Sequence, residues 1–270
     1  MILSSAALAG ATLLALLAYL VVAQGGAAPR RLQQALLLGL LAHLAALVID
    51  IAGLDEAPAR AHFGFAPALS ATLWMVIAVY MIESRLLPLA GARRMLAVLG
   101  ALGVLLGYAF QGVPIPSVSP WEPLHWLLGL ASYGLFGAAV LHAVLLNRAE
   151  ARLRLTRAGA SLEPAEVPQM PLLRLERLTF QFVAAGEIVL TLAILLGAWF
   201  TPQWHWDHKT LFALLGWAVV GGLLIGRGLF GLRGPRATRW IYVGAALLLL
   251  SYAGSRFVLE VVLHRPFPHS

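Results

Sequence analysis

The sequence predicts an all-α membrane protein: a polytopic helical bundle of about eight transmembrane helices, with both termini outside. Three observations predict this fold class. The 270-residue chain is 60% hydrophobic and only 11% charged, whereas about a quarter of the residues in a soluble domain are charged. Apolar runs of about 18 residues or more recur along the chain, as bilayer-spanning helices require. The basic residues are concentrated in alternate loops.

The apolar runs give the order of the spans. We expect them at about residues 3–23, 32–52, 66–82, 95–111, 124–146, 178–200, 210–226 and 240–263. The first run has no positively charged segment before it, and its apolar core is too long for a signal peptide, so we interpret it as a span. No polar segment is long enough to form a soluble core, which predicts a single membrane domain over residues 1–270.

Loop charges predict the orientation of the spans. Of the 19 basic residues, 15 fall in alternate loops: Arg30, Arg31, Arg85, Arg93, Arg94, Arg148, Arg152, Arg154, Arg157, Arg174, Arg177, Arg227, Arg233, Arg236 and Arg239. Loops with such an excess of Arg are cytoplasmic in membrane proteins. The net charge of +7 is therefore explained by membrane topology, and we expect the lipid bilayer, not nucleic acid, as the partner of these residues.

The longest cytoplasmic loop, residues 147–177, opens with an Arg-rich helical pattern. This pattern favours contact with a partner protein or with lipid headgroups. A solvated loop that only sets the topology is the alternative. The sequence contains no Cys, which excludes thiol chemistry, disulfide bonds and thioether attachment of haem by this chain.

An external loop at residues 200–209 is rich in Trp and His. Three Trp, two His, one Asp and one Lys lie between Trp199 and Thr210. Indole faces beside imidazoles suit a flat, apolar, metal-bearing ligand such as haem. The alternative is an aromatic belt, which places Trp at the headgroup level of many membrane proteins.

Four histidines lie at or near the outer surface on three separate elements: His125, His205, His208 and His264. Two neutral imidazoles can hold a haem iron from opposite faces. Each of these histidines taken alone is also consistent with an interfacial polar residue. Because all four are expected on the same side of the membrane, the sequence favours a ligand that they share.

Other ionisable residues fall inside the spans, where they are costly and usually functional. His43 and His142 lie in the second and fifth spans. The sequence fits two interpretations of His43: it binds a second, buried haem, or it forms a hydrogen bond to a neighbouring span. Asp50 falls seven residues after His43 and therefore on the same helix face. For Glu187 in the sixth span, the alternatives are a proton path and an interhelical hydrogen bond.

Three segments together resemble the haem-handling cytochrome c assembly family, which includes CcsA, CcmC and CcmF. Residues 204–210, W-H-W-D-H-K-T, resemble the family's Trp-rich W-x-W-D signature. Residues 124–133, L-H-W-L-L-G-L-A-S-Y, resemble the helix that carries one external haem-ligand His. Residues 252–264 resemble the final span, which leads to the second external His, with a spacing that differs by about one residue. The resemblance covers about residues 30–264 and is greatest for the small YpjD/HemX-type branch.

The resemblance implies a haem site at the outer, periplasmic surface. His125 and His264 would be the axial ligands of a haem b. His43 matches one of the family's membrane-embedded histidines, whereas Ile225 stands where the other is expected.

The resemblance also implies roles for the Trp-rich loop. Trp204, Trp206 and Asp207 would form a platform beneath the haem. Lys209 would pair with a propionate, as cations do with carboxylates. His208 stays a competing candidate ligand in the same loop.

The leading hypothesis is a haem-binding protein of the bacterial inner membrane, in c-type cytochrome biogenesis or haem handling, that is not an enzyme by itself. It would present its haem to a partner such as another cytochrome c assembly protein. An alternative is a non-catalytic, HemX-like accessory that adjusts haem synthesis through a cytoplasmic enzyme bound to residues 147–177. A third is a small proton-coupled transporter that uses Glu187 and His43.

Overall fold

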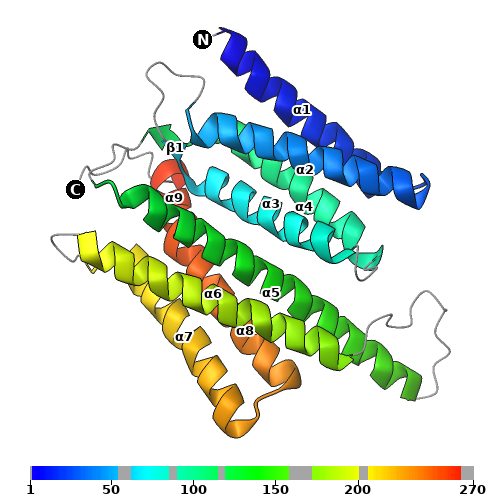
Figure 1. The fold of residues 1–270 in the computed structure, drawn as a ribbon, viewed down its shortest axis with the longest axis vertical. Helices are drawn as coiled ribbons and strands as arrows, with labels where there is room; N and C mark the ends of the chain where they lie inside the picture. Colours follow the sequence, from blue (N-terminus) through cyan, green and yellow to red (C-terminus); the bar gives the residue numbers. More distant parts are fainter. Residues whose placement is uncertain are drawn as a thin grey trace. The chain divides into compact units, whose positions relative to one another are not determined.

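The computed structural model describes residues 2–53, 62–84, 90–114, 119–157, 172–200 and 206–262. Within these residues, eight helices are long and apolar enough to cross a membrane, which confirms the predicted all-α polytopic bundle (Figure 1). The helices are α1 (Ile2–Gln24), α2 (Pro29–Ile51), α3 (Phe65–Ser84), α4 (Ala90–Ala109), α5 (Glu122–Arg157), α6 (Leu172–Phe200), α7 (His208–Phe230) and α8 (Gly234–Leu249). The chain continues beyond α8 through η2 (Leu250–Gly254), α9 (Ser255–Phe257) and η3 (Val258–Val262).

The helices on either side of the long cytoplasmic loop extend further than the predicted spans. Helix α5 continues to Arg157, whereas the span was predicted to end at residue 146. Helix α6 begins at Leu172, ahead of the predicted residue 178. Hydropathy detects only the part of a helix that lies in the bilayer, while Arg, Glu and Leu are also good helix formers in water. An ion pair at i,i+4 spacing, Glu150 with Arg154 at 3.9 Å, lies on this extension.

The chain divides into two compact units, each described separately below. The first contains residues 1–123 and 252–270, and the second contains residues 124–251. The expectation of a single membrane domain stays a prediction.

In the first unit, α1 packs against α2 and α4, and α3 packs against the same two helices. Tyr19 of α1 is fully buried where two glycines make room for its ring. A Cβ atom at Gly39 or at Gly100 would lie 2.9 Å from carbons of this ring. The strands β1 (His62–Phe63) and β2 (Val113–Pro114) pair antiparallel beside the helices.

In the second unit, α5, α6, α7 and α8 share an apolar core that includes Phe136, Val183, Val220 and Ile241. Gly186 of α6 lies against the ring of Phe136, where a Cβ atom would approach to 3.2 Å. Gly186 thus leaves room for the Phe136 ring between α5 and α6 at this point.

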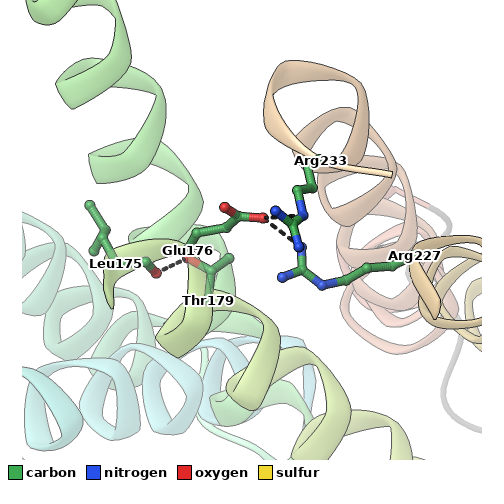
Figure 2. A network of polar contacts seen from close by, with 5 residues as sticks. All are labelled: Leu175, Glu176, Thr179, Arg227 and Arg233. Atoms are coloured by element: carbon green, nitrogen blue, oxygen red, sulfur yellow. Dashed lines mark hydrogen bonds and ion pairs between the residues drawn. The ribbon is translucent and has the colours of Figure 1, made fainter. Parts of the chain in front are cut away.

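A charged network joins three helices of the second unit at the end that the loop charges predict to be cytoplasmic. Figure 2 shows Glu176 of α6 between two arginines from the end of α7 and the start of α8. Its carboxylate accepts a hydrogen bond from Arg227 at 2.7 Å and lies 3.9 Å from Arg233. The Arg227 guanidinium also lies 3.7 Å from the centre of the Phe180 ring, as a cation–π contact requires. One carboxylate therefore compensates two cations here.

A wide helical turn follows α8 where hydroxyl groups compete for a backbone carbonyl. The carbonyl oxygen of Leu248 accepts hydrogen bonds from Tyr133 at 2.6 Å and from Ser251 at 2.8 Å. The chain takes up π-helical geometry in η2 directly afterwards. Side-chain groups that insert into the backbone ladder are a recognised cause of such distortions.

Candidate functional site

His125 lies in the first turn of α5, at the outer end of that span. Its Nδ1 is 2.9 Å from the carbonyl oxygen of Ala193 in α6. A carbonyl can only accept, so Nδ1 carries the proton and donates it. In the neutral ring, Nε2 is then the unprotonated nitrogen, which is the atom an imidazole offers to a metal. Metal-binding histidines are commonly oriented in this way by a backbone carbonyl.

Two residues of α6 fix the position of the His125 ring. Gly197 leaves the space that the ring occupies, since a Cβ atom there would lie 2.9 Å from the ring carbon Cε1. Phe200 meets the ring edge to face, with the centroids 5.6 Å apart. The imidazole is thus half-buried and held by hydrogen bonding and packing together.

Replacing Gly197 with Ala should therefore disturb the imidazole without removing it. The added methyl group displaces the ring from the Ala193 carbonyl, and we expect haem affinity to fall by roughly tenfold, the usual effect of losing such a supporting contact. Haemin titration followed by absorbance measures it. Gly129→Ala is the matched control, because no atom lies within 4 Å of the new Cβ.

The start of α7 carries the described part of the Trp-rich loop. Asp207 is the N-cap of α7: its backbone is extended and its carboxylate accepts a hydrogen bond from the Thr210 amide at 2.8 Å. His208 and Lys209 form the first turn and are exposed, as is Trp206, with 74% of its surface accessible. The signature therefore includes a capping residue that begins the helix after the loop.

We expect Asp207→Ala to lower the free energy of unfolding by about 0.5–2 kcal/mol, the usual cost of losing an N-cap. Asp207→Asn should retain most of the stability because an amide oxygen also caps. Thermal unfolding of the haem-free protein in detergent, followed by circular dichroism, measures both. Equal stability of all three proteins would contradict a capping role.

Several residues of the predicted site lie outside the described residues: Trp204, His205 and His264. Their roles stay predictions. Within the described parts of the chain, no group of three or more His, Asp or Glu side chains could hold a metal ion. A haem iron between two imidazoles needs no such group.

His43 lies in the first unit and is fully buried. Its Nδ1 is 3.2 Å from the Tyr19 hydroxyl, and its Nε2 is 2.8 Å from the Ser70 hydroxyl. Both ring nitrogens thus have hydrogen-bond partners on neighbouring helices. This is the hydrogen-bonded arrangement that the sequence allowed as the alternative to a buried haem.

The remaining intramembrane candidates lie in the second unit. His142 is fully buried, donates from Nδ1 to the Ala138 carbonyl at 2.8 Å and lies against the ring of Phe182. Glu187 is 9% exposed, and among the described residues its Oε2 has no hydrogen-bond partner. A Cβ atom at Gly221 of α7 would lie 3.0 Å from its Oε1.

Sequence reasoning did not identify the contacts of the Ser-Tyr pair that follows His125. Ser132 donates to the Gly129 carbonyl at 2.7 Å, within its own helix. Tyr133 reaches the Leu248 carbonyl and the Ser251 hydroxyl at the wide turn after α8. A Tyr eight residues after a candidate ligand, about 12 Å further along the same helix, is the signal that could have suggested an interhelical contact.

Comparisons with known proteins agree with the resemblance. The chain matches the family of cytochrome c assembly proteins over residues 32–263. An uncharacterized 28.8 kDa protein of Azospirillum brasilense is 28% identical over 242 residues, covering 81% of this chain and 85% of that protein. Inner membrane protein YpjD of Escherichia coli K12 is 29% identical over 147 residues, which are 53% of this chain and 54% of YpjD. No solved structure matches the chain.

The match covers most of the sequence, including all of the candidate spans except the first and the first three residues of the second. Together with the similarity to an inner membrane protein, the spans identify a multi-pass protein of the bacterial inner membrane. The chain therefore belongs to the cytochrome c assembly protein family.

Proposed function

We propose that this protein holds haem b as its cargo at the outer surface of the inner membrane, in c-type cytochrome biogenesis or haem handling. His125 is one axial ligand and His264 is the other. Family membership and the similarity to YpjD support the coarser statement, a membrane role in haem handling or cytochrome c biogenesis. His264 is proposed from the sequence alone.

The observation that carries the proposal is the orientation of His125. The Ala193 carbonyl holds the proton on Nδ1, so the neutral imidazole offers Nε2 as a ligand. Haem supplies an iron with two axial positions that imidazole nitrogens fill. Residues of α6 fix the ring before any cargo arrives, which lowers the entropy lost on binding.

The start of α7 supports a site for an anionic, aromatic cargo. Lys209 and the exposed Trp206 lie three residues apart in sequence at this helix end. A Lys can pair with a haem propionate, and an indole face can stack on a porphyrin. The positive end of the α7 dipole also favours carboxylates at this position. Trp204 and Asp207 complete the proposed platform, with Asp207 acting through the helix that it caps.

The test is spectroscopic. We expect protein purified in detergent to bind haemin with about one site per chain, to give a low-spin spectrum typical of two imidazole ligands, and to yield haem b in a pyridine haemochrome assay. A purified protein that is colourless, and stays colourless when haemin is added, would contradict the proposal.

A further inference from the structure

The first unit contains a polar cleft that the proposed haem site does not use. It is lined by residues of α1, α2, α3 and α4, and its cavity volume is about 10 Å³, the room that one water molecule needs. The polar side chains that line it are Thr12, His43, Asp50, Ser70 and Tyr108. Four of these five are at most 6% exposed, and Tyr108 is 45% exposed.

Polar groups buried in a membrane protein are costly unless they pair or contact water. One water molecule needs a cavity of about 10–15 Å³ and two to four polar partners, and the cleft offers both for about one molecule. Gly107 contributes to the space, because a Cβ atom there would lie 3.3 Å from the Ser70 hydroxyl. The cleft therefore fits water far better than it fits a lipid chain.

At the base of the cleft lies a chain of three hydrogen-bonding groups, Tyr19, His43 and Ser70. Hydroxyl groups both donate and accept, and a neutral imidazole donates from one nitrogen while it accepts at the other. Both tautomers of His43 can thus be hydrogen-bonded at both nitrogens. The group can exchange a proton without breaking the arrangement of its heavy atoms.

The cleft opens toward the outside in the topology that the loop charges predict. Asp50 and Tyr108 lie near the outer ends of α2 and α4. Asp50 is seven residues from His43, about 10 Å along the same helix face. Among the described lining residues, Asp50 is the acidic one and none is Lys or Arg, so the opening favours cations over anions.

We propose that this cleft holds a water molecule that is reached from the outer surface, and that the Tyr19–His43–Ser70 group at its base exchanges protons with it. The ligand is water together with the hydronium ion. The titratable groups that face His43 are Tyr19 from α1, Asp50 from its own helix and Tyr108 from α4. From α3, His43 meets the Ser70 hydroxyl. His125, the proposed haem ligand in the second unit, does not line this cleft.

The absence of Cys allows a direct test with single-cysteine variants of the full chain in intact cells. N-ethylmaleimide reacts with thiolates, which form in water and not in an apolar environment, so Thr12→Cys and Ser70→Cys should label roughly tenfold faster than a lipid-facing cysteine. Leu41→Cys is the matched control, since Leu41 is 55% exposed on the helix surface two residues from His43. Pretreatment from outside with a membrane-impermeant cationic methanethiosulfonate should block the labelling.

A second measurement uses the unaltered protein. In water-edited solid-state NMR of ¹⁵N-histidine-labelled protein in lipid bilayers, the ring nitrogens of His43 should receive magnetisation from water. His142 should not, although it is equally buried. Spectra of His43→Gln and His142→Gln assign the two signals.

Either of two results overturns the proposal: Thr12→Cys and Ser70→Cys as unreactive as Leu41→Cys, or labelling that the external reagent does not block. The proposal is also overturned if the His43 ring receives no more magnetisation from water than the His142 ring does.

Discussion

Replacing His125 with glycine is expected to remove the bound haem, lowering the haem content of purified protein by roughly tenfold or more. The variant loses the nitrogen that binds iron and leaves a space beside Gly197 where the ring was. Imidazole added to the buffer can enter this space and should restore the low-spin spectrum. The measurement is the absorbance of the haemin-titrated protein with and without imidazole.

The control for this experiment is His62→Gln. His62 belongs to the first unit and donates from Nδ1 to the Asp50 carbonyl at 3.0 Å. A Gln amide can also donate, so we expect this variant to keep its haem. An unchanged haem content in His125→Gly would contradict the assignment. So would a loss that imidazole fails to restore in a variant with a normal circular dichroism spectrum, because His125 would then have a structural role only.

Removing the carboxylate of Glu176 is expected to have the largest effect on stability. Its side chain is 14% exposed and that of Arg227 is 24% exposed. Glu176→Ala leaves Arg227 and Arg233 close together with no compensating charge. Breaking a buried ion pair in this way costs about 3–5 kcal/mol, and the partial exposure of Arg227 lowers our expectation to roughly 2–3 kcal/mol. Thermal or denaturant unfolding in detergent measures the difference.

The matched control for Glu176 is Glu150→Ala. Glu150 also pairs with an arginine, but Arg154 is 72% exposed and the charged atoms are 3.9 Å apart. Exposed pairs at this spacing contribute about 0.3–0.5 kcal/mol. If both variants lose equally little stability, the network shown in Figure 2 does not hold α6, α7 and α8 together at the cytoplasmic side.

The spans could be predicted from the sequence because hydropathy reports directly on the length of chain that the bilayer needs. The ends of the helices could not. Helix α5 continues to Arg157. The polar residues in its last turns would fit a loop, but they also fit a helix that is exposed to water. Hydropathy contains no signal that separates these two outcomes.

The partners of His43 could not be predicted, because they come from helices 24 and 27 residues away in sequence. Tyr19 reaches His43 only where Gly39 and Gly100 let α1 approach α2 and α4 closely. Helical periodicity shows on which face of a helix a residue lies. It does not show which residue of another helix packs against that face.

For the candidate haem site, the sequence predicts ligands but not the groups that surround them. The signature segments identify His125 and the start of α7, since they are recognisable as sequence. The carbonyl of Ala193 that orients His125 could not be recognised, because every residue carries one. Gly197 leaves space for the His125 ring because it has no side chain. Nothing in the sequence indicates that a Gly, and not an Ala, is needed at this position.

The π-helical turn after α8 affects how the last span should be aligned with its relatives. Hydrogen bonds in a π-turn run from residue i to i+5 and enclose one residue more than those of an α-turn. A wide turn at Leu250–Gly254 can therefore accommodate a one-residue insertion while the helix continues. The spacing of residues 252–264 differs from that of the family's final span by about one residue. An alignment gap placed in this turn, and a helical wheel restarted after it, would assign the following side chains to their correct faces.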